Sequence, residues 1–314
     1  MAKGKSQDRV DKILAKLSRA GVEHVRFELP DMHGSARSKQ VPIESFAQYA
    51  RDGVNMYGGV ISLDSASNVV PGSRYNEEVN YCDQTLIPDF DTLAPVPWLN
   101  NTARLICDTE WAPGEPLRAA PRYVMGEMLR RLDKLGLKAV MSHEYEFYVL
   151  DRETRQPFFD GVHIFNNLRN EQLPVIRQVI DHLRAAGLHM LTANAEYAPS
   201  QFELVYSHVE GMAGADNAYT FKNGVKEIVQ QAGQLATFMT KPFAGSAGSG
   251  CHYHVSLLRK KGGANVFIDS SKPDTMSDTL RYFVQGIIDH GAACMALFNP
   301  TPNCYRRLRP HTFA

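Results

Sequence analysis

The chain contains two kinds of hydrophobic pattern. Apolar residues recur every three to four positions in some stretches, which predicts amphipathic helices, and alternate with polar residues in others, which predicts strands with one polar face. We predict helices at residues 6–20, 44–51, 121–135, 172–186, 215–240 and 275–298. We predict strands at residues 25–29, 39–43, 103–110, 138–150, 200–206 and 250–258.

The spacing of these elements changes along the chain. Residues 57–98 are rich in Gly, Pro, Asn and Asp, which predicts a small strand-and-loop region. Beyond a turn near Pro113 the predicted elements become longer and alternate between helix and strand. We therefore predict an α+β fold with two domains, 1–112 and 113–314.

Composition narrows the classes of partner. The 314 residues hold 34 Lys and Arg and 34 Asp and Glu, so no excess of charge favours a nucleic-acid partner or an anionic membrane. The polar start MAKGKSQDRV lacks the apolar core of a secretory signal, and no stretch is apolar enough to span a bilayer. Five cysteines without a CxxC pair are typical of reduced thiols. We expect a cytoplasmic protein.

Three predicted strands each have a polar face. Glu144 and Glu146 share one face in AVMSHEYEFYVL. In SQFELVY, Glu203 shares a face with Gln201, and Glu196 precedes this strand by a short turn. In GCHYHVSLL the same alternation aligns a third set, which consists of His252, His254 and Ser256.

A metal site follows if these strands adjoin in one sheet. Four Glu and two His side chains then converge, and carboxylates so close together stay ionised only if cations neutralise them. Carboxylate oxygens with some imidazole suit magnesium or manganese better than structural zinc. For a single ExE strand, an exposed polar face is the better interpretation, whereas three such strands favour a site for several metals.

Two further segments permit two interpretations each. The loop KPFAGSAGSG leads into a strand, so it is neither a Rossmann fingerprint nor a P-loop, both of which end in a helix N-terminus. Its glycines allow either close approach of a ligand or a flexible connection. Near the end, Arg306, Arg307 and Arg309 are either a clamp for a carboxylate or solvated surface residues.

Together these segments resemble the glutamine synthetase family. HEYEF, NAEYAPSQFE, KPFAGSAGSGCHYHVSL and NPTPNCYRRLRP match the family's catalytic-domain motifs in order. PDMHGSARSKQVP and CDQTLIPDFDTLAPVPW agree more loosely with its small domain. The resemblance implies an N-terminal β-grasp-like domain, followed by a catalytic domain whose curved antiparallel sheet is backed by helices.

The resemblance also implies residue roles. One metal, near the amino-acid substrate, would be held by Glu146, Glu196 and Glu203. A second metal, on the ATP phosphates, would be held by Glu144 and His252, and the ATP contacts would be His254 and Ser256. The substrate glutamate would contact Gly248 and Arg307, and the candidates for attracting and deprotonating ammonium are Glu196 and Asp64.

The implied activity is an ATP-dependent ligase that joins ammonia or a small amine to the γ-carboxylate of L-glutamate through a γ-glutamyl phosphate. Magnesium or manganese would be required, and a ring-like homo-oligomer is implied by the resemblance. Ser200 and Cys251 replace a glycine and a methionine of the motifs, and RPHTFA departs from the usual ending, which leaves the amine open.

Two alternatives remain. The chain stops at Ala314, earlier than the family pattern, so we expect a C-terminally truncated catalytic domain. A truncated or non-catalytic protein with the same fold is therefore the first alternative. A metal-dependent hydrolase that uses the HxH residues is the second, and the late position of HxH in the chain disfavours it.

Overall fold

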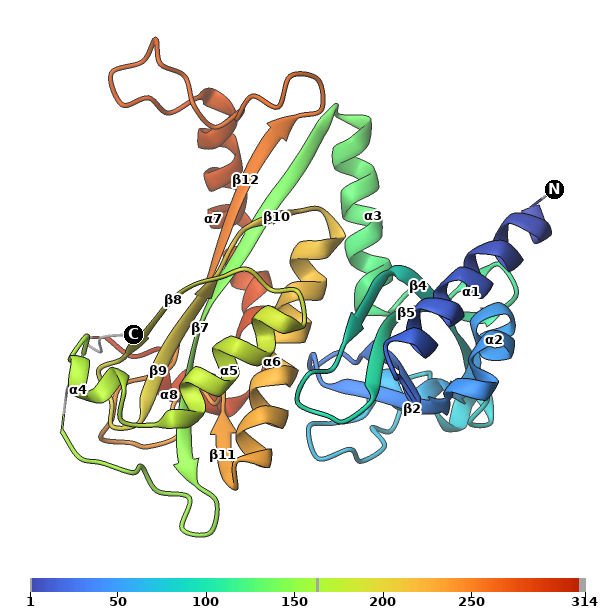
Figure 1. The fold of residues 1–314 in the computed structure, drawn as a ribbon. Coiled ribbons are helices and arrows are strands. Elements are labelled where there is room, and N and C mark those ends of the chain that lie inside the picture. The colour runs from blue at the N-terminus through green and yellow to red at the C-terminus, as the bar shows by residue number, and fades with distance from the viewer. Residues whose placement is uncertain (1, 162–163, 311–314) are drawn as a thin grey trace. The chain divides into compact units, whose positions relative to one another are not determined.

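The computed structural model of the protein describes residues 2–161 and 164–310 (Figure 1). Its internal contacts divide the chain into two compact units. The first comprises Met1–Met128, Ala185–Gly187 and Ala215–Asn223, and the second comprises Leu129–Arg184, Leu188–Gly214 and Gly224–Ala314. The predicted domain boundary near Pro113 stays a prediction.

The first unit is built on a mixed sheet. Its strands are β1 (His24–Pro30), β2 (Ala36–Pro42), β3 (Val54–Tyr57), β4 (Asp83–Pro95), β5 (Thr102–Ala112) and β6 (Glu115–Pro116). They are ordered β2-β1-β5-β4-β3, with β6 paired to β5. Only β1 and β5 run parallel among these pairs of described strands. A β-grasp topology for this unit stays a prediction.

Helices and short turns complete the first unit. They are α1 (Ala2–Arg19), α2 (Ile43–Asp52), the 3-10 turns η1 (Gly58–Ser62) and η2 (Glu77–Val79), and the start of α3 (Pro121–Lys134). The core includes the fully buried Val10 of α1, Phe27 of β1, Phe46 of α2 and Leu105 of β5. Most residues of β1 and β5 are buried, so their apolar side chains pack in this core.

A buried arginine joins several elements of the first unit. Arg122 of α3 is 5% exposed, and its guanidinium donates to Asp89 at 2.7 Å, to Asp108 at 2.7 Å and to both oxygens of Asp216 at 2.9 Å. These carboxylates lie on β4, on β5 and in residues Ala215–Asn223. The fork of guanidinium donors therefore ties together three carboxylates from three segments.

The second unit contains the curved antiparallel sheet that carries the polar-faced strands. Its central strand is β7 (Leu137–Asp151), which pairs with β9 (Gln201–Tyr206), β10 (Val209–Glu210), β11 (Gln234–Thr237) and β12 (Cys251–Arg259). Strand β8 (Met190–Ala195) pairs with β9, and all of these pairs are antiparallel. Figure 1 shows β12 beside the long β7. The α+β class and the curved sheet are confirmed.

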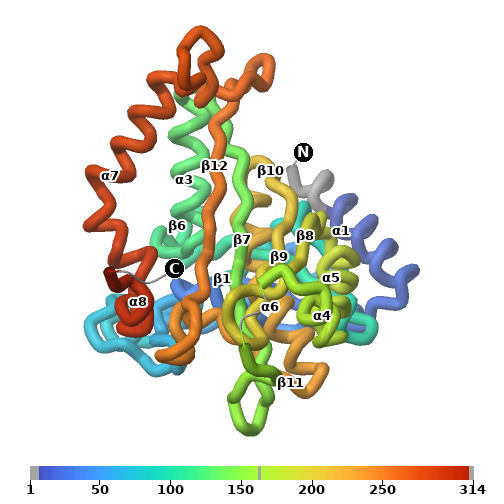
Figure 2. Tube along the Cα trace, turned by 90° about the vertical axis from the view of Figure 1, so that its left-hand side faces the viewer, coloured from blue at the N-terminus to red at the C-terminus, as the bar shows by residue number. Residues whose placement is uncertain are grey.

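Helices accompany this sheet. They are α4 (Asn167–Asn170), α5 (Pro174–Ala185), α6 (Met212–Gln231), α7 (Asp278–Phe298) and α8 (Pro302–Arg307). In Figure 2, α7 and α5 lie on opposite sides of the strands β7 and β12.

The predicted helix at residues 215–240 was wrong at its end. Gly233 has a φ of 77°, which stops the helix, and β11 follows.

Two other expectations concern the whole of the described chain. All five cysteines are free, as expected from their spacing. Within residues 2–161 and 164–310, no helix combines the length and the apolar character that crossing a membrane requires.

Candidate metal centre and substrate loop

The three polar-faced strands adjoin in the sheet of the second unit. Glu144 on β7 lies opposite His252 on β12, and Glu146 lies opposite Glu203 on β9. Cross-strand neighbours on the same face lie about 5 Å apart between Cβ atoms. Strand pairing therefore brings together carboxylates and imidazoles that are far apart in the sequence.

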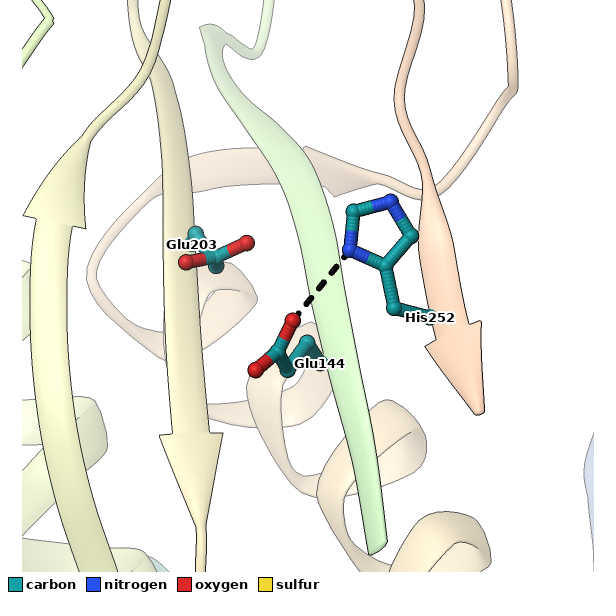
Figure 3. Close-up of side chains that lie close together, drawn as sticks. All are labelled: Glu144, Glu203 and His252. Carbon is teal, nitrogen blue, oxygen red and sulfur yellow. Dashed lines mark hydrogen bonds and ion pairs between the residues drawn. The ribbon is translucent and has the colours of Figure 1, made fainter. Parts of the chain in front are cut away.

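Glu144 is the centre of this cluster. Its two carboxylate oxygens lie 3.2 Å from Nδ1 of His252 and 3.2 Å from Nε2 of His254. Ligand atoms of Glu144, Glu203 and His252 all lie within 4.8 Å of one another, and Figure 3 shows them on three neighbouring strands. These three residues lie close enough together to contribute to a metal site.

The cluster changes the acidity of its carboxyl groups in opposite directions. Burial acts to raise the pKa of Glu144, but hydrogen bonds from His254 and His252 outweigh it and hold this pKa below its usual value. Burial and the nearby carboxylates of Glu196, Glu144 and Glu146 raise the pKa of Glu203 to about 7. The cluster therefore favours the protonated, neutral form of Glu203 when no cation is bound.

Glu146 and Glu196 belong to the same crowded region. Burial raises the pKa of Glu146, and the charge of Glu196 adds to the effect. Burial also raises the pKa of Glu196, against a hydrogen bond that Asn194 donates at 2.8 Å. The raised pKa values show that these carboxylates resist ionisation, through burial and through repulsion between them. A bound divalent cation would remove this repulsion, and carboxylate and imidazole groups are suitable ligands for it. The residues present therefore fit a metal site.

The glycine-rich loop passes close to this cluster. A methyl group at Gly250 would lie 2.9 Å from Oε1 of Glu146 and 3.1 Å from Nε2 of His252, so only glycine fits without displacing them. A methyl group at Gly248 would lie 2.7 Å from Cδ of Arg307. The backbone of Gly248 and the side chain of Arg307 thus lie together, and their contact with a substrate stays a prediction.

Two residues that sequence reasoning did not assign to the site hold this loop. Gln201 donates from Nε2 to Glu146 at 3.0 Å and to the carbonyl oxygen of Gly248 at 2.9 Å. Tyr148 donates its hydroxyl to the carbonyl oxygen of Ala247 at 2.6 Å. The available signal was that Gln201 shares a strand face with Glu203 and that Tyr148 shares one with Glu146.

The chain is similar to proteins of known family. Residues 118–314 match the family described as glutamine synthetase, catalytic domain. The chain belongs to the glutamine synthetase family. It is 33% identical over 309 residues to a glutamine synthetase of Thermotoga maritima, covering 96% of this chain and 67% of that protein.

Two further relatives support the family assignment. A glutamate–isopropylamine ligase of a Pseudomonas species is 30% identical over 304 residues, covering 93% of this chain and 66% of that protein. A solved structure described as a GmaS/ADP complex superposes with a TM-score of 0.83 at 27% identity, over 95% of this chain and 67% of that one. The chain thus spans about two thirds of the length of these glutamine synthetase relatives.

One departure from the glutamine synthetase motifs has a structural correlate. Ser200 stands where the motif has glycine, and it adopts a left-handed backbone with a φ of 57°. The residue is fully buried, and its hydroxyl accepts a hydrogen bond from the amide of Phe158 at 2.8 Å. This bond offsets part of the steric cost of a left-handed serine, which is about 1–2 kcal/mol.

The remaining candidates lie in two places. Ser256 is on β12 and shares a strand face with His252 and His254. Asp64 is in the first unit, where its carboxylate accepts hydrogen bonds from the amides of Ala66 and Asn68 at 2.8 Å and from the Asn68 side chain at 3.0 Å. The hydrogen bonds from Asn68 hold the pKa of Asp64 below its usual value. In this conformation Asp64 caps its own loop.

Proposed function

We propose that the protein is an ATP-dependent ligase that joins ammonia or a small amine to the γ-carboxylate of L-glutamate. The observation that supports this most directly is the convergence of Glu144, Glu203 and His252. This cluster lies beside the loop that contains Gly248, against which the side chain of Arg307 packs. A cluster of metal-ligand side chains next to an arginine and a glycine backbone suits a reaction in which one substrate is a polyphosphate and the other is a carboxylate.

The proposed metal ligands are the clustered acidic and imidazole side chains. Glu146, Glu196 and Glu203 would hold one divalent cation, and Glu144 and His252 would hold a second. Bound magnesium or manganese would neutralise the charge on the phosphates. Because ligand atoms of Glu203 lie within 4.8 Å of those of Glu144 and His252, the two proposed groups of ligands adjoin.

The proposed reaction has two steps. A γ-carboxylate oxygen of glutamate attacks the γ-phosphorus of ATP, and the bond to the ADP oxygen breaks, which gives a γ-glutamyl phosphate. The amine nitrogen then attacks the acyl carbon, and inorganic phosphate leaves. Since only a neutral amine attacks, a carboxylate such as Glu196 or Asp64 would take the proton from the ammonium form.

The protein's own residues would orient the substrates in this reaction. Arg307 would pair with the α-carboxylate of glutamate, for which a guanidinium has matching geometry, while the backbone of Gly248 contacts the same substrate. His254 and Ser256 would contact ATP. The ring-like homo-oligomer and the cytoplasmic location are part of the proposal; the first rests on the resemblance, and the second rests on the composition of the sequence.

The acceptor of the γ-glutamyl group is an amine or ammonia. One relative is named for isopropylamine, and another is named glutamine synthetase. We therefore propose a small amine or ammonia as the acceptor and leave the choice to a panel of amines.

The test is release of ADP by the purified chain with ATP, glutamate, magnesium or manganese and each amine. We expect amine-stimulated release that Glu146→Ala abolishes and that Glu153→Ala, which removes an exposed acid just beyond β7, leaves unchanged. Binding of ATP and manganese without any release, for every amine, would instead support the non-catalytic alternative. Hydrolysis supported by zinc without ATP would support the hydrolase.

A further inference from the structure

The side chain of Gln201 is completely enclosed between the candidate metal cluster and the glycine-rich loop. It is 1% exposed. Its amide nitrogen donates to Oε2 of Glu146 at 3.0 Å, to the carbonyl oxygen of Gly248 at 2.9 Å and to Oγ of Ser249 at 3.2 Å. Its amide oxygen accepts from the backbone of Ala198 at 3.1 Å. Both ends of the amide are therefore engaged, which fixes its orientation.

The first consequence concerns Glu146. Gln201 holds Oε2, whereas Oε1 lies on the side of Gly250, where Nε2 of His252 also lies. A hydrogen bond to an ionised carboxylate is about twice as strong as one between neutral groups. Gln201 therefore determines which oxygen of Glu146 faces the histidine side of the cluster.

The second consequence concerns the loop. The carbonyl of Gly248 is fixed by the same NH2 group, and the side chain of Arg307 lies directly against Gly248. One nitrogen donates to both Glu146 and the carbonyl oxygen of Gly248. A shift of the Gln201 amide toward one of these acceptors must therefore change its hydrogen bond to the other. A small buried network of this kind responds as a unit.

We propose that Gln201 is a positioning residue that couples metal binding at Glu146 to glutamate binding at Gly248 and Arg307. The inference rests on the proposed function for the identity of the second ligand. A cation held by Glu146 would favour the same fixed orientation of this carboxylate, in which Oε2 accepts from Gln201. That arrangement also holds Gly248 in place, so each ligand favours the binding of the other.

The experiment compares Gln201→Met with Tyr148→Phe, both nearly isosteric. Gln201→Met removes the donor that serves the metal cluster and the loop. Tyr148→Phe removes only the hydroxyl bond to Ala247 of the same loop. Calorimetry measures the affinity for manganese, and the affinity for glutamate with and without manganese. Thermal unfolding identifies variants that fail to fold, and Gln201→Asn, which is too short to reach both acceptors, then replaces the methionine variant.

We expect manganese to raise the glutamate affinity of the unaltered protein at least about fivefold. In Gln201→Met we expect this factor to approach one and the manganese affinity to fall about tenfold. In Tyr148→Phe we expect weaker glutamate binding, but an unchanged manganese affinity and an unchanged coupling factor. A residue with a merely structural role would lower stability in both variants without separating the two ligands.

Two results overturn the inference. One is a wild-type coupling factor in Gln201→Met, or in Gln201→Asn where it replaces that variant, and the other is an unchanged manganese affinity in the same variant. If the unaltered protein binds manganese but neither binds glutamate nor releases ADP, the proposed function fails. The coupling to glutamate then fails with it, and the manganese affinity of Gln201→Met still decides whether Gln201 positions Glu146 for metal binding.

Discussion

The raised pKa of Glu203 provides a direct test of the candidate metal centre, because Glu203→Gln removes the ionisable group and keeps the shape of the side chain. Burial and the neighbouring carboxylates raise its pKa from an ordinary value of 4.5 to about 7. The folded protein thus binds this proton more tightly than the unfolded chain does. Without metal, the stability contributed by this group is present at low pH and is lost as the pH rises from 4.5 through about 7.

The size of the effect follows from the shift and from the exposure of the side chain. A shift of this size corresponds to about 3 kcal/mol at full strength. Glu203 is only half-buried, so solvent screening reduces this to about 1 kcal/mol. We expect Glu203→Gln to raise the free energy of unfolding of the metal-free protein by about 1 kcal/mol at pH 8 and to have little effect near pH 4.

Manganese is expected to reverse this order. A ligand at 100 times its Kd stabilises the folded protein by about 2.7 kcal/mol, whereas a variant that binds it tenfold more weakly gains about 1.4 kcal/mol at the same concentration. The variant is then less stable than the unaltered protein when manganese is present, and more stable when EDTA is present.

The assay is urea unfolding followed by circular dichroism at pH 4 and pH 8, with EDTA or manganese. Glu153→Gln is the control, because Glu153 is exposed to solvent outside the cluster and we expect it to change neither measurement. The reasoning is refuted if Glu203→Gln is no more stable than the unaltered protein in EDTA at pH 8 and gains as much stability from manganese.

Three further predictions concern backbone and charge. In Gly250→Ala the new methyl lies 2.9 Å from a carboxylate oxygen of the cluster, so we expect about tenfold weaker manganese binding by calorimetry; Gly245→Ala, with no atom within 4 Å, serves as the control. Arg122→Met leaves three carboxylates without their cation and should lower the free energy of urea unfolding by about 3–5 kcal/mol, against less than about 0.5 kcal/mol for the exposed Arg131→Met. At the left-handed Ser200, thermal unfolding should show Ser200→Gly to be more stable than Ser200→Ala by about 1 kcal/mol, and equal stabilities would contradict the assigned backbone strain.

The sequence predicted the long elements beyond Pro113 because their periodicity is strong. The strand predicted at residues 138–150 is β7 (Leu137–Asp151), and the helix predicted at residues 121–135 is α3 (Pro121–Lys134). Prediction was weaker where local signals conflict. The long strand β4 was not predicted as a separate element and fell within the predicted strand-and-loop region, because Pro88 and several aspartates interrupt its alternation of apolar and polar residues.

The chemistry of the site was predictable as a set of residue types. Alternation determines which side chains share a strand face, so the placement of Glu144 and Glu146 on one face follows from their spacing alone. Carboxylates with imidazoles indicate hard divalent cations whatever the fold. These inferences need only local geometry, which the sequence determines.

The tertiary structure decided which of these side chains meet. Glu144 and His252 are 108 residues apart, and Glu146 and Gln201 are 55 apart, so strand register alone sets their contacts. The pKa of Glu203 depends on burial and on charges from other strands. The sequence therefore determined what kind of site this chain builds, and long-range packing determined its geometry, because electrostatic and hydrogen-bond energies depend on distances that no local pattern contains.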